Sequence, residues 1–146
     1  MSVIVEIAVP ALLGLRRSRS RSGSGLGLAT HVEEGLPLSA LDRLVHVLAP
    51  SEGSFAYRIV PRATLARRRV QGARLTPRES ARVVRLAEIW AFARDVWKDD
   101  APARRWLFEP HTVLESRRPV DVVLMNEFGR RLVQDILGRI RYSTGL

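Results

Sequence analysis

Arginine is the residue type in this 146-residue sequence whose placement most strongly indicates a function. Six arginines and a single acidic residue, Glu79, lie between Pro61 and Ser80, which gives this window a net charge of +5. Concentrated positive charge attracts polyanions, and arginine can contact both phosphates and guanine edges. The window therefore indicates nucleic-acid binding. The residues that we expect to contact DNA are Arg62, Thr64, Arg67, Arg68 and Arg69.

Catalytic and metal-binding residues are sparse. His31, His46 and His111 lack the spacing of metal ligands on one helix, and the chain contains no cysteine. His46 lies in an apolar segment and is better explained as a core or boundary residue. Asp99 and Asp100 could pair as carboxylates, but an acidic turn that caps a helix explains them better. We therefore expect no enzyme activity, no metal and no cofactor.

Three short helices are expected to position the arginines. Apolar residues recur at helical spacing in segment 36–48, and Ser51 can cap a second helix in segment 51–60, which Gly53 weakens. The third helix, in segment 61–70, carries the arginines. Three short helices with a basic third one are typical of a helix-turn-helix. A solvated basic face that joins two parts of a helical bundle is the alternative interpretation.

The longest predicted helix, in segment 74–97, is the element around which we expect a small bundle to form. Thr76 is a suitable N-cap, Pro77 is tolerated at the first position, and Glu79 completes a capping box. Apolar residues cover more than half of its circumference, so several neighbours must cover it. Because the apolar surface of this helix is so wide, we expect a homodimer whose core or interface includes three tryptophans, Trp90, Trp97 and Trp106.

Three more helices are predicted after residue 97. The first begins at Asp100 or Ala101, the second begins at Pro119, and the third is capped by Asn126. Gly129 lowers helix propensity, so a close approach to a neighbouring backbone is its expected purpose. The last helix is amphipathic through Leu132, Val133, Ile136, Leu137 and Ile140. Because no useful strand-like alternation follows Leu36, the expected fold class is all-α.

The first 31 residues are expected to be a disordered appendage. The apolar run in segment 3–9 is interrupted by Glu6, followed by Pro10 and too short to span a membrane, and no basic residue precedes it. Segment 16–27 alternates arginine with serine and glycine, which cannot bury apolar surface. It could be a nonspecific nucleic-acid arm or a flexible tail, and we expect no membrane association.

Four ordered motifs resemble the carboxy-terminal toxin-binding domain of Xre/MbcA/ParS-like antitoxins. They are LTPRESARVVRLAEIW, ARRWLFEP in segment 103–110, RRPVDVVL in segment 117–124, and G-x-x-x-V-x-D-x-L-x-R-I in segment 129–140. Segment 60–69, VPRATLARRR, is similar to the second half of the degenerate helix-turn-helix of this family. The resemblance implies a helix-turn-helix DNA-binding domain over residues 32–73 and a helical toxin-binding domain over residues 74–146.

Family resemblance also implies a function and a set of partners. The expected partners are a RES-domain toxin that consumes NAD, whose active-site entrance the antitoxin covers, and the operator DNA of the shared operon. A cytoplasmic location is expected. The alternative is a stand-alone helix-turn-helix transcriptional regulator that needs no toxin. The residues expected to bind the toxin are Arg117, Arg118, Arg139, Arg141, Tyr142 and Leu146.

Those toxin-binding residues have a simpler structural explanation. Arginines near the carboxyl end of a helix stabilise its dipole without any partner. The tail RYSTGL is also longer than the usual ending of the family, soon after a tyrosine-glycine pair, which could change how a toxin is blocked.

Overall fold

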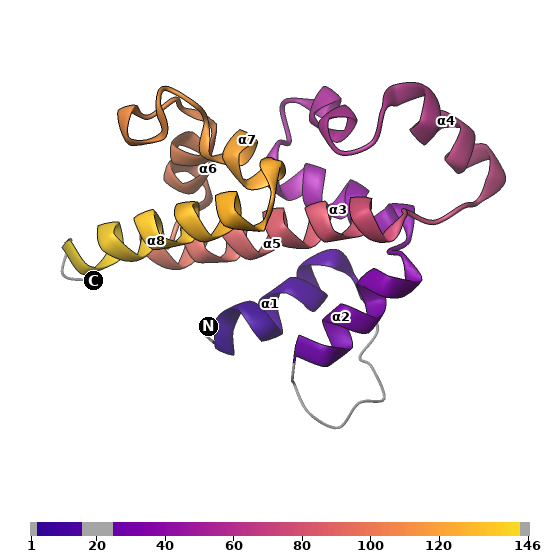
Figure 1. Cartoon of the computed structure of the whole chain (residues 1–146), viewed down its shortest axis with the longest axis horizontal. Coiled ribbons are helices and arrows are strands. Elements are labelled where there is room, and N and C mark those ends of the chain that lie inside the picture. The colour runs from indigo at the N-terminus through magenta and orange to yellow at the C-terminus, as the bar shows by residue number, and fades with distance from the viewer. Residues whose placement is uncertain (1–2, 16–24, 144–146) are drawn as a thin grey trace. The chain divides into compact units, whose positions relative to one another are not determined.

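Helices make up the protein, which confirms the all-α prediction (Figure 1). The computed structural model describes residues 3–15 and 25–143. Within these residues the β structure is one isolated bridge between His111 and Arg117. None of the helices in these two ranges is both long and apolar enough to cross a membrane. The helices are α1 (Val3–Leu13), α2 (Gly25–Glu34), α3 (Leu38–Leu48), η1 (Gly53–Arg58), α4 (Arg62–Gln71), α5 (Pro77–Trp97), α6 (Asp100–Phe108), η2 (Thr112–Leu114), α7 (Pro119–Met125) and α8 (Glu127–Ser143).

The chain divides into two compact units, residues 1–87 and residues 88–146. The division falls inside α5, whereas the sequence predicted a domain boundary after residue 73. The difference has a simple cause. The first half of α5 packs with the helices that precede it, so the capping box that begins α5 belongs to unit 1.

Helix α1 corrects the expectation that the first 31 residues are a disordered appendage. Val9 and Leu13, one helical turn apart, are buried, and α1 packs against α3. Gly14 ends α1 in the left-handed region (φ +67°). The apolar run was too short to indicate this packing, because the surface that covers it comes from a distant helix. The expectation remains untested for segment 16–24, which lies outside the described residues.

The predicted capping box of α5 is confirmed. The backbone N–H of Thr76 donates to the Glu79 carboxylate (2.8 Å), and the N–H of Glu79 donates to the Thr76 hydroxyl oxygen (3.1 Å). Glu79 also forms an ion pair with Arg68 of α4. Burial would raise the pKa of Glu79, but the hydrogen bonds from Arg68 and Thr76 together hold its pKa below the usual value. The carboxylate is therefore charged at neutral pH and joins α4 to the start of α5.

A second set of polar contacts joins the α2–α3 turn to the start of α5. The buried Ser80 hydroxyl accepts a hydrogen bond from the N–H of Leu36 (2.8 Å), and Leu75 donates its N–H to the carbonyl of Leu36 (2.9 Å). The Arg74 guanidinium donates to the carbonyl of Gly35 (3.1 Å). These bonds satisfy backbone groups that would otherwise be buried without a partner.

The second predicted short helix is a six-residue 3₁₀ helix, η1. Ser51 does not cap it, since the N-cap position is Glu52 and no side chain makes a capping bond there. Gly53, its first residue, is the weakness that the sequence indicated. Phe55 of η1 and the following Ile59 are nonetheless buried. Packing of these two side chains therefore holds the segment in place.

In unit 2, α8 lies alongside the second half of α5 and runs in the same direction (Figure 1). Arg130, near the start of α8, lies 3.8 Å from the carboxylate of Glu88, and Arg141, near its end, pairs with Asp95. The hydrogen bond to Glu127 is the main cause that raises the pKa of the largely buried Arg130. Two ion pairs separated by three helical turns thus fix the orientation of α8 on α5.

The junction of α7 and α8 confirms two predictions: Asn126 caps the last helix, and Gly129 allows a close approach to a neighbouring backbone. The side-chain oxygen of Asn126 accepts a hydrogen bond from the N–H of Gly129 (3.1 Å), which caps α8. A β-carbon on Gly129 would overlap the carbonyl oxygen of Val122 in α7. Only glycine therefore permits this approach of the two helices.

We expect Gly129→Ala to lower the free energy of unfolding by about 2 kcal/mol, since the added methyl group overpacks a backbone contact. The matched control is Gly138→Ala in the same helix, where nothing lies within 4 Å of the added atom. That change should raise stability by up to about 1 kcal/mol through helix propensity. Urea unfolding followed by circular dichroism measures both. Equal effects of the two changes would show that the α7–α8 approach does not limit stability.

Candidate functional site

Two of the arginines predicted to contact DNA form ion pairs inside unit 1. Arg68 pairs with Glu79 with both side chains mostly buried, and Arg69 donates two hydrogen bonds to the Asp42 carboxylate (2.7 and 3.0 Å). The bond to Asp42 also raises the pKa of Arg69. These two side chains therefore hold α4 against α5 and α3, and they are less available to a polyanion than a count of arginines suggests.

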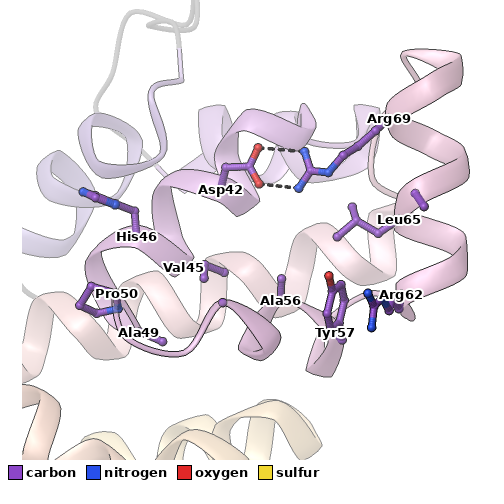
Figure 2. Close-up of a pocket in the computed structure, with 12 residues that line it drawn as sticks. Asp42, Val45, His46, Ala49, Pro50, Ala56, Tyr57, Arg62, Leu65 and Arg69 are labelled. Atoms are coloured by element: carbon purple, nitrogen blue, oxygen red, sulfur yellow. Dashed lines mark hydrogen bonds and ion pairs between the residues drawn. The ribbon is translucent and has the colours of Figure 1, made fainter.

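A surface hollow lies between α3, η1 and α4, and Figure 2 shows the residues that line it. The Asp42–Arg69 ion pair crosses one side of the hollow, and Arg62 lies 5.6 Å from the ring of Tyr57 on another. His46 is exposed on its wall, so its prediction as a core or boundary residue was wrong. The lining mixes apolar side chains such as Val45 and Leu65 with the charged Asp42, Arg62 and Arg69, so it is less apolar than the lining of a typical small-molecule site.

The exposed side of α4 carries the residues that are best placed to bind a polyanion. Leu65 is the buried residue of α4, and Arg67 lies about 200° further around the helix. Arg67 is consequently exposed, Arg62 is exposed at the first position of α4, and Thr64 is half-buried. We call Arg62, Thr64 and Arg67 the α4 outer residues. Of the five predicted DNA contacts, these three are placed so that contact with DNA does not require an internal ion pair to break.

Three of the predicted toxin-binding arginines also have partners within unit 2. Arg118, the N-cap residue of α7, bonds Asp121 (2.8 Å) and lies 5.5 Å from the Phe108 ring. Arg141 pairs with Asp95. Arg117 is exposed and lies 3.6 Å from Glu115. Arg118 and Arg141 thus contribute to the packing of unit 2, whereas Arg117 remains on its surface.

The exposed face of α8 carries the remaining predicted residues and two that sequence reasoning missed. Arg139 is exposed, and Tyr142 is 86% exposed. Phe128 and Leu132, which are 76% and 44% exposed, lie on the same face at helical spacing. We call the stripe formed by Phe128, Leu132, Asp135, Arg139 and Tyr142 the α8 ridge. Leu146 lies outside the described residues.

Leu132 was expected in the buried stripe of α8, and that assignment was wrong. The helix buries Val133, Ile136 and Leu137. It is therefore turned about its own axis so that Leu132 faces outward. The steps of four, three, four and three residues from Phe128 to Tyr142 were visible in the sequence. Asp135 and Arg139 interrupt the apolar pattern, so the spacing of apolar residues alone does not reveal this face.

Ser80 and His111, two side chains of types that can take part in catalysis, make structural contacts. Ser80 is buried and accepts the bond from Leu36. The His111 ring stacks on Trp106 (5.0 Å between centroids), and its Nε2 donates to the Trp106 carbonyl (2.8 Å). Across residues 3–15 and 25–143, no group of three or more acidic or histidine side chains is arranged to hold a metal ion.

Two family models match the chain in succession. The antitoxin Xre-like helix-turn-helix domain matches residues 27–88, and the antitoxin Xre/MbcA/ParS carboxy-terminal toxin-binding domain matches residues 92–142. The junction between the matches falls within α5, as does the division between the two structural units. The first match contains α4 with its outer residues, and the second contains the α8 ridge.

Individual relatives carry the same name. The protein Antitoxin Xre of Pseudomonas putida is 31% identical over 119 residues, which cover 80% of this chain and 72% of that protein. The chain belongs to the Xre antitoxin family. Antitoxin Xre of Yersinia enterocolitica is 34% identical over 85 residues, which cover 58% of this chain and 57% of that protein. The two matched domains are a toxin-binding domain and a helix-turn-helix domain, neither of which is an enzyme domain. Membership of this family therefore confirms the prediction that the chain is not an enzyme.

Arg67 and Arg68 are neighbours in this Xre-family chain that should differ in their effect on stability. We expect Arg68→Ala to lower the free energy of unfolding by about 2 kcal/mol, since it leaves the buried Glu79 carboxylate without its guanidinium partner. Arg67→Ala should change it by less than about 0.5 kcal/mol, as is usual for an exposed side chain. Thermal and urea unfolding of both variants test this. If Arg68→Ala unfolds like the parent protein, the ion pair with Glu79 does not hold α4 in place.

Proposed function

We propose that this Xre-family protein is an antitoxin that binds and neutralises a RES-domain toxin and also binds the operator of its own operon. The observation that carries the proposal is the carboxyl end of α8. Within the region matched by the toxin-binding domain, Tyr142 is almost fully exposed beside the exposed Arg139. Tyrosine and arginine are common anchors of protein interfaces.

Neutralisation in this proposal needs no chemistry from the antitoxin. A toxin that consumes NAD must admit an anionic dinucleotide, so it is expected to have an open, electropositive cleft. An antitoxin can inhibit it by filling the mouth of that cleft. Arg139, Tyr142 and the residues that follow them are the part of the chain that we assign to this contact, with the exposed Arg117 as a further candidate.

DNA binding is assigned to the α4 outer residues. Arg62 and Arg67 would contact phosphates, and Thr64 would contribute to sequence preference. A helix-turn-helix protein usually binds a two-fold symmetric operator as a dimer, so we also propose a homodimer on DNA. The tryptophans give the dimer less support than expected, because Trp90 is buried within a single chain and Trp97 packs on Trp106.

A stand-alone transcriptional regulator is the second candidate, and the exposed Arg62 and Arg67 are the observation that favours it. The two candidates differ in their genomic context. A neighbouring reading frame of the size of a RES toxin supports the antitoxin, whereas an isolated gene supports the regulator. Rescue of growth and co-purification on co-expression with that frame test the antitoxin directly.

For the DNA contact, we expect Arg67→Ala to weaken operator binding and to reduce the slope of log K against log salt concentration by about 0.9, since one phosphate contact is lost. Thr64→Ala should leave this slope unchanged while relaxing sequence preference. Fluorescence anisotropy with the chain's own promoter over a range of salt concentrations measures both effects. If the Arg62→Ala, Arg67→Ala double variant binds the promoter as tightly as the parent protein, α4 does not contact the phosphates.

For neutralisation, we expect removal of residues 142–146 to leave the helical content unchanged and to abolish protection from the toxin, because the mouth of the toxin's cleft would no longer be filled. The single changes Tyr142→Ala and Arg139→Ala should each weaken the complex by about 2 kcal/mol if they are hot spots. Growth rescue and cellular NAD concentration are the measurements. A truncated protein that still preserves NAD would place neutralisation on another surface.

A further inference from the structure

The amino-terminal half of the α8 ridge exposes two large apolar side chains, Phe128 and Leu132. Large exposed apolar side chains that share one face usually mark an interaction site. The region matched by the toxin-binding domain has five exposed large apolar residues, and three of them belong to the ridge: Phe128, Leu132 and Tyr142. Met125, three residues before Phe128 at the end of α7, is 60% exposed as well.

We infer that Phe128 and Leu132 are the main anchors of the toxin, and that they are separate from the end of α8 that inhibits it. This inference rests on the proposed function. The occupant is the toxin because the ridge lies entirely within residues 92–142, the region matched by the toxin-binding domain, and continues along one face to Tyr142. Affinity and inhibition would then belong to different ends of a single helix.

The ridge has the spacing by which a helix binds in a groove. Its members follow steps of four, three, four and three residues, and Phe128 and Tyr142 are about 21 Å apart along the axis at 1.5 Å per residue. The opposite face of α8 is already buried through Val133 and Leu137, and ion pairs of Arg130 and Arg141 fix the helix on α5. The ridge is therefore presented on a preorganised helix, which lowers the entropic cost of binding.

The charges on this face indicate what the toxin's groove must offer. Arg131, also exposed, lies 5.9 Å from the Phe128 ring, and Arg139 lies one turn after Asp135. The exposed face thus has two arginines and one aspartate. A complementary groove would be apolar opposite Phe128 and Leu132, with an acidic group facing Arg131 and a basic group facing Asp135.

The test compares three variants of the full chain with the purified toxin encoded by the neighbouring reading frame. Phe128→Gln combined with Leu132→Gln removes the anchors but retains residues that favour a helix. Val113→Gln is the matched control, because Val113 is 62% exposed in η2 and lies outside the ridge. The third variant lacks residues 142–146. Calorimetry measures the dissociation constant, and NAD consumption by the toxin measures inhibition.

We expect the double variant to bind the toxin at least about 100-fold more weakly, as for two hot-spot residues, and the control to bind within about threefold of the parent protein. The truncated protein should bind no more than about 30-fold more weakly than the parent protein, which is the loss expected for Tyr142 alone, yet fail to inhibit. Both glutamine variants should melt at the parent temperature, because the residues replaced are exposed.

Three outcomes would overturn the inference, and they are distinguishable. If the parent protein does not bind the toxin, the proposed function fails together with the inference. If the parent protein and the double variant bind equally well, the inference fails and the proposed function stands. If light scattering without toxin shows that the double variant loses a dimer that the parent protein forms, while toxin binding is unchanged, the ridge is a surface for a second copy of the chain.

Discussion

The carboxylate of Glu79 is the interaction on which the arrangement of unit 1 depends most. It accepts the N–H of Thr76, which begins α5, and it pairs with Arg68, which holds α4. A charge that is largely removed from water is tolerated only when such partners compensate for its lost hydration. Because the same carboxylate serves both contacts, the start of the longest helix and the position of the helix-turn-helix arginines are determined together.

Local patterns allowed most of the secondary structure to be predicted from the sequence. The capping box at Thr76 and the cap at Asn126 each depend on residues a few positions apart, and both are confirmed. The close approach at Gly129 depends on the absence of a β-carbon at one glycine, and it is confirmed as well. The helix α1 and the outward rotation of Leu132 were not predicted. Both depend on surfaces supplied by distant segments, which periodicity within a single helix cannot reveal.

The candidate site was predicted less well than the fold, and charge is the reason. A count of arginines treats each one as available to a ligand, whereas Arg68, Arg69 and Arg141 have acidic partners 11, 27 and 46 residues away in the sequence. Only the folded structure places those partners. It leaves a smaller set of exposed cations, Arg62, Arg67 and Arg139 among them, and it adds Phe128, an apolar residue that a search for charge overlooks.

The aromatic packing in unit 2 has a consequence for spectroscopy. All three tryptophans of the chain, Trp90, Trp97 and Trp106, belong to residues 88–146. Trp97 and Trp106 have ring centroids 5.7 Å apart, and His111 stacks on Trp106. Tryptophan emission therefore originates entirely in the unit that carries the α8 ridge. Trp97 and Trp106 lie well past the division inside α5, so their emission reports the folding of unit 2, whereas circular dichroism reports the helices of both units.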